Sequence, residues 1–155
     1  MRIIVFSDSH GRSDVLVDIV RFHPNAALYL HLGDGAADYY RLCAMFPDKN
    51  ITHLCGNCDM ASLSEAELFL PLERGHSLFA AHGHNFGVKF SLSAMKAEAR
   101  KNGADIMLYG HTHEPVSFYE DGLHIMNPGA AMFRSYGMVD DSFPGFFMSA
   151  GHRSD

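Results

Sequence analysis

Acidic, amide and imidazole side chains recur in short glycine-containing segments along the chain. These segments read Asp8-Ser9-His10-Gly11, Gly33-Asp34-Gly35, Gly56-Asn57-Cys58-Asp59, His82-Gly83-His84, Gly110-His111-Thr112-His113 and Asn127-Pro128-Gly129. Ligands at positions i and i+2 lie on one side of an extended segment, so they can chelate one ion together. Glycine beside each polar group lets the backbone turn sharply and approach a ligand closely. These residue types and spacings indicate metal binding.

The number of ligand residues favours two ions over one. Seven residues offer ligand atoms: Asp8, His10, Asp34, Asn57, His82, His111 and His113. That is too many for one ion, whereas two ions that share a carboxylate use them naturally, at the ~3.5–4 Å spacing of two-metal hydrolytic sites. Oxygen and imidazole ligands without thiolate suit manganese, iron, nickel, cobalt or zinc, and manganese is the expected ion. Two divalent ions, Asp8, Asp34 and one hydroxide sum to about +1, which attracts a phosphate ester.

The segments that precede these loops read as elements of an α/β fold. Strands are expected at 2–6, 27–32 and 51–55 because these runs are apolar and rich in β-branched residues. A helix capped by Ser13 and stopped by Pro24 follows the first strand, and a helix at 38–46 follows the second. This alternation implies a parallel sheet with right-handed crossovers. Ligands of such sheets sit beyond the carboxyl ends of the strands, so the polar loops can converge on one crevice.

The rest of the chain predicts a second group of strands. They are expected at 68–72, 77–82, 105–109, 115–119, 123–126 and 143–148. Hairpin turns are expected at 73–75 and 121–122, and a helix from Ser91 to a terminating Gly103. Residues 150–155 look polar and loose. The pattern predicts one α/β domain over residues 1–155, with two mixed sheets packed together and helices outside.

The order of the motifs resembles that of a known family. From Asp8 to Gly129 the chain reads D-x-H, G-D, G-N-C-D, H-G-H, G-H-T-H and N-P-G, and this resembles the calcineurin-like metallophosphoesterases, most closely their small YfcE-type phosphodiesterases. The resemblance implies a four-layer α/β/β/α sandwich with a two-metal centre. By position, one ion is held by Asp8, His10, Asp34 and His113, and the other by Asp34, Asn57, His82 and His111. It further implies in-line attack on phosphorus by a hydroxide that bridges the two ions.

The expected function is that of a metal-dependent phosphoesterase, with a phosphodiesterase preferred. A phosphomonoesterase of the same fold is one alternative. The other is a non-catalytic scaffold, like the retromer subunit that resembles this family but has lost key site residues. The completeness of the ligand set separates the enzyme from the scaffold, and here the set is complete.

Cys58 stands where many members of the superfamily carry a histidine that helps to protonate the leaving group, and YfcE-type members also have cysteine there. A thiol, with a reference pKa of about 8.5, is a poorer proton donor near pH 7 than imidazolium. Proton donation is then left to His84, Asp59 or solvent. The candidate catalytic residues are therefore Asn57, His84 and Asp59.

Composition narrows the class of partner. The formal charge of −6 over 155 residues disfavours binding to a nucleic-acid backbone by bulk charge. No apolar run approaches the roughly 20 residues of a membrane helix, and the N-terminal apolar stretch is too short for a signal peptide. We therefore expect a cytoplasmic protein without a membrane partner that acts on a small phosphoester. A homo-oligomer stays open.

Several other residues could suggest chemistry but have simpler interpretations. The histidines outside the motifs are expected on the surface or in packing: His23, His31, His53, His76, His124 and His152. Cys55-x-x-Cys58 is interpreted as a coincidence, because a zinc site needs two further ligands of matching spacing and only Cys43 is left. Arg12 and Arg134 flank motif loops and are expected to be solvated.

Overall fold

The strands of the chain form two mixed sheets. The computed structural model describes residues 1–143 and 145–152, and within them each sheet has five strands. The first sheet has the spatial order β10-β9-β1-β2-β3 and contains β1 (Arg2–Phe6), β2 (Leu28–His31), β3 (Ile51–His53), β9 (Ser135–Phe143) and β10 (Gly145–His152). The second has the order β4-β5-β6-β8-β7 and contains β4 (Glu67–Pro71), β5 (Ser77–Ala81), β6 (Ile106–Leu108), β7 (Val116–Glu120) and β8 (Leu123–Asn127). The predicted fold class is confirmed.

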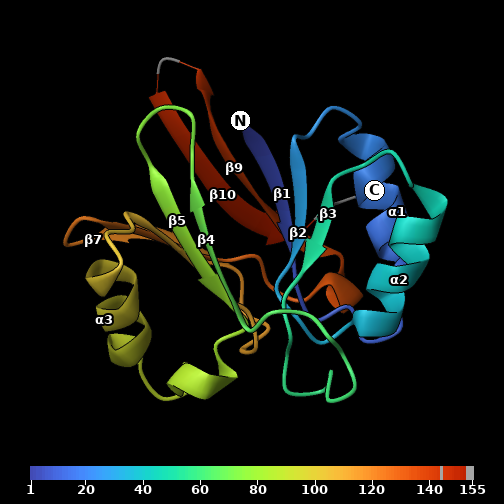
Figure 1. Cartoon of the computed structure of the whole chain (residues 1–155), viewed down its shortest axis with the longest axis horizontal. Helices are drawn as coiled ribbons and strands as arrows, with labels where there is room; N and C mark the ends of the chain where they lie inside the picture. Colours follow the sequence, from blue (N-terminus) through green and yellow to red (C-terminus); the bar gives the residue numbers. More distant parts are fainter. Residues whose placement is uncertain (144, 153–155) are drawn as a thin grey trace.

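Helices cover the outer face of each sheet. The helices are α1 (Ser13–Phe22), α2 (Ala36–Met45) and α3 (Ser93–Lys101), with two short 3₁₀ turns, η1 (His84–Phe86) and η2 (Ala131–Phe133). Figure 1 shows α1 and α2 together on one outer side of the molecule and α3 on the other, with both sheets between them. The layers are therefore α/β/β/α, as the family resemblance implied.

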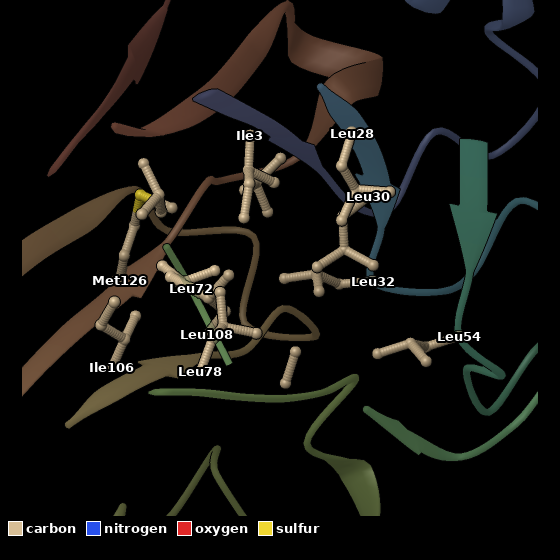
Figure 2. Packing of buried hydrophobic residues seen from close by; sticks show 13 residues of the cluster. Ile3, Leu28, Leu30, Leu32, Leu54, Leu72, Leu78, Ile106, Leu108 and Met126 are labelled. Atoms are coloured by element: carbon tan, nitrogen blue, oxygen red, sulfur yellow. The ribbon is translucent and has the colours of Figure 1, made fainter. Parts of the chain in front are cut away.

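Alternating side chains along each strand explain this layering. In β1, Ile3 and Val5 belong to the cluster between the two sheets, whereas Ile4 and Phe6 pack with α1. Figure 2 shows the cluster between the sheets, where residues of β1 and β2 face residues of β5, β6 and β8. Each such fully buried aliphatic side chain contributes roughly 1.5–3 kcal/mol to folding. The three apolar clusters thus fix the two sheets and their helices as one unit.

Parallel pairing brings the motif loops to one edge. Strands β1, β2 and β3 are parallel neighbours, as are β5, β6 and β8. Each of these strands runs directly into one of the polar segments, and the carboxyl ends of parallel neighbours lie at the same edge. The two sheets therefore deliver their polar loops to a common place.

The C-terminal part of the chain differs from the sequence-based expectation. A single strand at 143–148 was expected, but residues 135–143 and 145–152 form an antiparallel pair, and β9 also pairs with β1. The alternate buried positions of β9 include Ser135, Gly137 and Asp141 as well as Val139, so burial alternates without an apolar pattern. Residues 150–152, expected to be loose, pair with 135–137, and residues 153–155 lie outside the described residues.

The starts of the three helices also differ, and α2 begins at Ala36 rather than at residue 38. Ser13 is the first residue of α1 but makes no capping hydrogen bond, because the cap position is Arg12, whose guanidinium binds Asp14. The third helix begins at Ser93 rather than Ser91, and the Ser91 hydroxyl accepts a hydrogen bond from the Ser93 N–H.

None of the helices in the described part of the chain is both long and apolar enough to cross a membrane.

Candidate metal centre

The ligand residues lie in an unusual backbone conformation. Among described residues other than glycine, seven have positive φ, and five of these seven are expected ligands: Asp8, His10, Asp34, His111 and His113. Positive φ is uncommon outside glycine and is retained where the surrounding structure holds it in place, often at functional sites. The sharp reversal after each strand turns these side chains back toward the edge shared by the two sheets.

The first ligand group joins the loops after β1 and β6. The side chains of Asp8, His10 and His113 offer ligand atoms that all lie within 4.8 Å of one another. Asp8 Oδ1 is 3.2 Å from His113 Nε2 and 3.7 Å from His10 Nε2. This group therefore has one carboxylate oxygen facing two imidazole nitrogens.

The second ligand group joins the loops after β2, β5 and β6. Asp34, His82 and His111 also offer ligand atoms within 4.8 Å of one another, and Asp34 Oδ2 is 3.3 Å from His82 Nε2. The same Asp34 oxygen is 3.9 Å from His10 Nε2 of the first group. Asp34 thus lies between the two groups, where a bridging carboxylate is required. A third overlapping set, His10, Asp34 and Cys58, also satisfies the 4.8 Å criterion, although Cys58 was not among the expected ligands.

Three atoms that can accept hydrogen bonds lie close together at His82: its own Nε2, Asn57 Oδ1 and Asp34 Oδ2. His82 Nδ1 donates to the Leu32 carbonyl oxygen at 2.9 Å, so in the neutral ring Nε2 carries a lone pair. That Nε2 lies 3.0 Å from Asn57 Oδ1 as well as 3.3 Å from Asp34 Oδ2. Acceptors in such proximity are favourable only when a proton or a cation lies among them. The structure therefore brings Asn57 to the second ligand group, although the amide side chain itself is exposed.

An unpaired buried oxygen marks the first group. Asp8 is fully buried, and its Oδ2 accepts hydrogen bonds from the Ser7 hydroxyl at 2.6 Å and the His111 N–H at 3.1 Å. Its Oδ1 accepts no hydrogen bond from any described residue. A buried carboxylate oxygen without a partner is costly, and a bound cation removes that cost. Because of this oxygen, the side chains of the first group fit a divalent metal ion.

The electrostatics of Asp34 also favour a cation. Burial raises its pKa, but hydrogen bonds from His82 and from the Cys58 N–H outweigh burial and lower the pKa to about 2. Burial lowers the pKa of His82, and the interactions with Asp34 and Asp8 outweigh this and raise it. A permanently ionised carboxylate in a nearly water-free position is suited to holding a metal.

Two glycines are required by the close approach of ligand side chains. A Cβ atom on Gly56 would lie 2.2 Å from Asp34 Oδ1, and one on Gly110 would lie 2.2 Å from the Ser7 hydroxyl oxygen. Both distances are far below van der Waals contact, so neither position accepts a side chain without displacing a ligand loop. Gly56 therefore makes room for the Asp34 carboxylate, and Gly110 makes room for the Ser7 hydroxyl that binds Asp8.

The surroundings of Asp59 disfavour its expected role as a proton donor, which stays a prediction. Asp59 is buried, and its carboxylate accepts four backbone N–H groups: Asp34 and Gly56 on Oδ2, Gly35 and Ala36 on Oδ1. Burial raises its pKa, but His53 and these backbone donors lower the pKa far below the ordinary value of 3.8. A carboxylate that is always ionised cannot supply a proton near pH 7. Asp59 instead ties the Asp34 loop and the start of α2 to the loop after β3.

His84 lies near the second ligand group but is not one of its members. Its ring centroid is 5.4 Å from that of His82 and 6.2 Å from that of His111. Burial and the neighbouring His82 lower its pKa, so the ring is neutral near pH 7 before any interaction with a substrate. Its Nδ1 is buried and has no hydrogen-bond partner among the described residues. His84 is therefore close enough to act on a bound ester, and its role stays a prediction.

Comparison with known proteins identifies the family. Residues 1–141 match the model of the calcineurin-like phosphoesterase superfamily domain. The chain belongs to this superfamily. It is 32% identical over 131 residues to the probable metallophosphoesterase YsnB of Bacillus subtilis, covering 84% of this chain and 75% of YsnB. It is 32% identical over 100 residues to the phosphodiesterase YfcE of Escherichia coli, covering 56% of this chain and 50% of YfcE.

A solved structure supports the same relationship. A predicted phosphoesterase from Streptococcus pneumoniae superposes with a TM-score of 0.77 and 27% sequence identity, covering 96% of this chain and 87% of that one. The sequence-based assignment to the calcineurin-like phosphoesterases, and the similarity to YfcE, are confirmed.

Sequence reasoning missed the network beneath the ligands of this phosphoesterase domain. His31 Nδ1 accepts the Gly33 N–H at 3.0 Å, so its Nε2 donates to the Ser9 hydroxyl at 2.9 Å. Ser9 in turn donates to Asp38 Oδ2 at 2.6 Å. All three side chains are buried, and burial lowers the pKa of His31 to about 3, which keeps its ring neutral. Because Ser9 lies between Asp8 and His10, and Gly33 precedes Asp34, this network holds both carboxylate loops.

Proposed function

We propose that this chain is a metal-dependent phosphodiesterase with two divalent ions. The observation that carries the proposal is the position of Asp34 between two ligand groups, one of which contains a buried oxygen of Asp8 that accepts no hydrogen bond from any described residue. A single ion cannot use ligand sets on both sides of one carboxylate. The ligand chemistry is that of hydrolytic two-metal sites.

The proposed ligand assignment follows the two groups. One ion is held by Asp8, His10, Asp34 and His113, and the other by Asp34, Asn57, His82 and His111. When bound, the ions supply a water of lowered pKa and neutralise negative charge on the phosphoryl oxygens. Manganese is the preferred ion, with nickel, iron, cobalt or zinc as alternatives, because the ligands are oxygen and imidazole.

The protein residues contribute position and charge. The His82–Leu32 hydrogen bond fixes which ring nitrogen faces the site, and the Ser7 and His111 hydrogen bonds fix the Asp8 carboxylate. Two divalent ions and the two aspartates sum to about +2, so an anionic ester is attracted despite the acidic protein. Cys58, an exposed thiol in the third ligand set, has its pKa raised first by burial and then by Asp34, so it is a weak proton donor at neutral pH.

Two alternatives remain to be tested against the phosphodiesterase: a phosphomonoesterase and a non-catalytic scaffold. We propose a small phosphoester as the substrate and a cytoplasmic location, without bulk binding to nucleic acid, and a homo-oligomer is compatible with this function. The complete set of seven ligand residues supports the enzyme over the scaffold.

A panel of substrates tests this choice. Metal-depleted protein is loaded in turn with manganese, nickel, cobalt, iron and zinc, and each form is assayed with bis(4-nitrophenyl) phosphate and 4-nitrophenyl phosphate. We expect the diester to be hydrolysed with the higher kcat/KM by at least one metal form. Faster hydrolysis of the monoester would make the chain a phosphomonoesterase, and no hydrolysis by any metal-loaded form would favour the scaffold.

A further inference from the structure

A groove opens directly beside the two ligand groups. It has a volume of about 470 Å³ and lies between α2 and the segment 58–62. Three residues of the ligand cluster, His10, Asp34 and Cys58, line it. The volume is within the ~300–1,000 Å³ of pockets that hold small molecules. An ester whose phosphate lies among the ligands therefore has this groove within reach of one of its organic arms.

Both walls of the groove are largely apolar. Ala36, Ala37 and Tyr40 contribute from α2, and Met60 and Ala61 contribute from the opposite segment. Met60 is 94% exposed and Tyr40 is 54% exposed, so large apolar surfaces face water beside a polar site. A tyrosine ring and a thioether are groups that make favourable contacts with an aromatic ring. These walls suit a flat aromatic group better than a short alkyl chain, which would cover little of them.

The charged side chains of the groove further restrict which organic groups it can accept. Asp59 is used by four backbone N–H groups, and Asp38 Oδ2 accepts from the Ser9 hydroxyl and the Gly11 N–H. The Asp59 carboxylate is therefore committed to the wall, and so is Oδ2 of Asp38, whereas Asp38 Oδ1 is buried without a hydrogen bond from any described residue. Arg41, which also lines the groove, follows Gly35 by six residues, or about 9 Å along the helix axis. With three carboxylates and one arginine among its lining residues, the groove suits a neutral arm better than a negatively charged one.

We propose that this groove, which we call the α2 groove, binds an aromatic arm of the phosphoester. The preferred substrates are then phosphodiesters with a flat aromatic or heteroaromatic group, and esters of small alkyl alcohols are poor substrates. This inference rests on the proposed function, because it takes the phosphate to lie among the metal ligands.

Binding of two phosphonates tests the groove independently of turnover. Phenylphosphonate carries a phenyl group on phosphorus where methylphosphonate carries a methyl group, and an ester hydrolase does not cleave the carbon–phosphorus bond of either. Their Kd values are measured by calorimetry on the manganese-loaded protein. We expect phenylphosphonate to bind at least tenfold more tightly than methylphosphonate. Equal Kd values would overturn the proposal.

Substitutions in the α2 groove test whether the phenyl ring binds there. Tyr40→Ala combined with Met60→Ala removes both large apolar walls and should reduce the ratio of the two Kd values to below about threefold, with the Kd of methylphosphonate within twofold of the unmodified protein. Met45→Ala is the matched control, because Met45 is 52% exposed on the same helix but does not line the groove. Tyr40→Phe should retain the ratio. A ratio that survives the double variant would show that the ring binds elsewhere.

The outcome also separates this proposal from the proposed function. Selective binding of phenylphosphonate by a protein that hydrolyses none of the esters would support the groove and contradict the phosphodiesterase. Manganese-dependent hydrolysis with equal phosphonate affinities would support the phosphodiesterase and overturn the groove.

Discussion

Replacing Asp59 by alanine should lower the free energy of unfolding by about 3–5 kcal/mol. The Asp59 carboxylate accepts four backbone N–H groups at 2.7, 2.9, 3.0 and 3.1 Å. A hydrogen bond to a charged group is worth about 1.5–3 kcal/mol, and a buried donor left without a partner costs about 1–3 kcal/mol. Two of the four donors, the N–H groups of Asp34 and Gly56, are buried. These two alone account for the expected loss, and the two part-buried donors can turn to water.

Urea unfolding at pH 7, followed by circular dichroism, measures this loss. Asp48→Ala is the matched control, since Asp48 is exposed, and it should stay within about 0.5 kcal/mol of the unmodified protein. Because 3–5 kcal/mol is a large part of the 5–15 kcal/mol typical of a domain, Asp59→Asn is included as a milder variant. A loss below 1 kcal/mol for Asp59→Ala would refute the argument that this carboxylate holds the loops.

The pH dependence checks the sign of the same interaction. The pKa of Asp59 in the folded protein is below its ordinary value of 3.8, so its contribution is complete above that value and is lost as the pH falls. At pH 3 the difference in stability between the unmodified protein and Asp59→Asn should be about 1 kcal/mol smaller than at pH 6. A difference that grows on acidification would contradict an ionised Asp59.

If Asp59 is not the proton donor, folded Asp59→Asn should show the same dependence of rate on leaving-group pKa as the unmodified enzyme.

Three further substitutions test the site. Asp34→Asn removes the charge shared by both ions, so manganese affinity, measured by calorimetry, and turnover should fall by orders of magnitude. The exposed Asp48→Asn should change turnover less than twofold. Losses of similar size in the two variants would contradict the bridging role of Asp34. The Cys58 thiol is a weak proton donor, so log kcat/KM should fall steeply across esters of rising leaving-group pKa, and Cys58→His should flatten the series and raise monoester hydrolysis. A flat series before substitution would instead point to an efficient acid such as His84. Ser9→Ala breaks the hydrogen bond to His31, so the free energy of unfolding should fall by about 1–3 kcal/mol. The affinity for manganese should fall as well. An unchanged manganese affinity in the folded variant would show that the network does not position the ligands.

The candidate ligand residues could be picked out from the sequence because each lies in a loop that follows a short apolar strand. The run at Arg2–Phe6 predicts a buried strand, and the run at 27–32 predicts its parallel neighbour. Once two parallel strands are placed, the residues after their carboxyl ends must lie together. Asp8 and Asp34 are therefore brought to one edge by patterns that are local in sequence.

The buried polar residues could not be predicted in this way. His31 has no motif around it, and its burial depends on Ser9 and Asp38, which come from other elements of the fold. The same reason explains the missed strand β9, whose buried face includes Ser135 and Asp141. Ser135 donates to the Pro128 carbonyl oxygen, and Asp141 accepts from the Met1 amino group.

The α2 groove was equally invisible in the sequence. Its two walls are more than ten residues apart along the chain, and Met60 and Tyr40 follow no repeated spacing. The hydrogen bonds of Asp59 to the start of α2, together with the Cys58 N–H to Asp34 bond, connect the two walls. Asp59, one of the candidate proton donors in the sequence analysis, thus helps to position the two walls of the proposed α2 groove.

The number of manganese ions needed for turnover tests the two-ion site most directly. Metal-depleted protein is titrated with Mn²⁺ while hydrolysis of bis(4-nitrophenyl) phosphate is followed. The position of Asp34 between two ligand groups predicts no hydrolysis before manganese is added and a plateau at two equivalents per chain. Full hydrolysis by the metal-depleted protein, or a plateau at one equivalent, would contradict it.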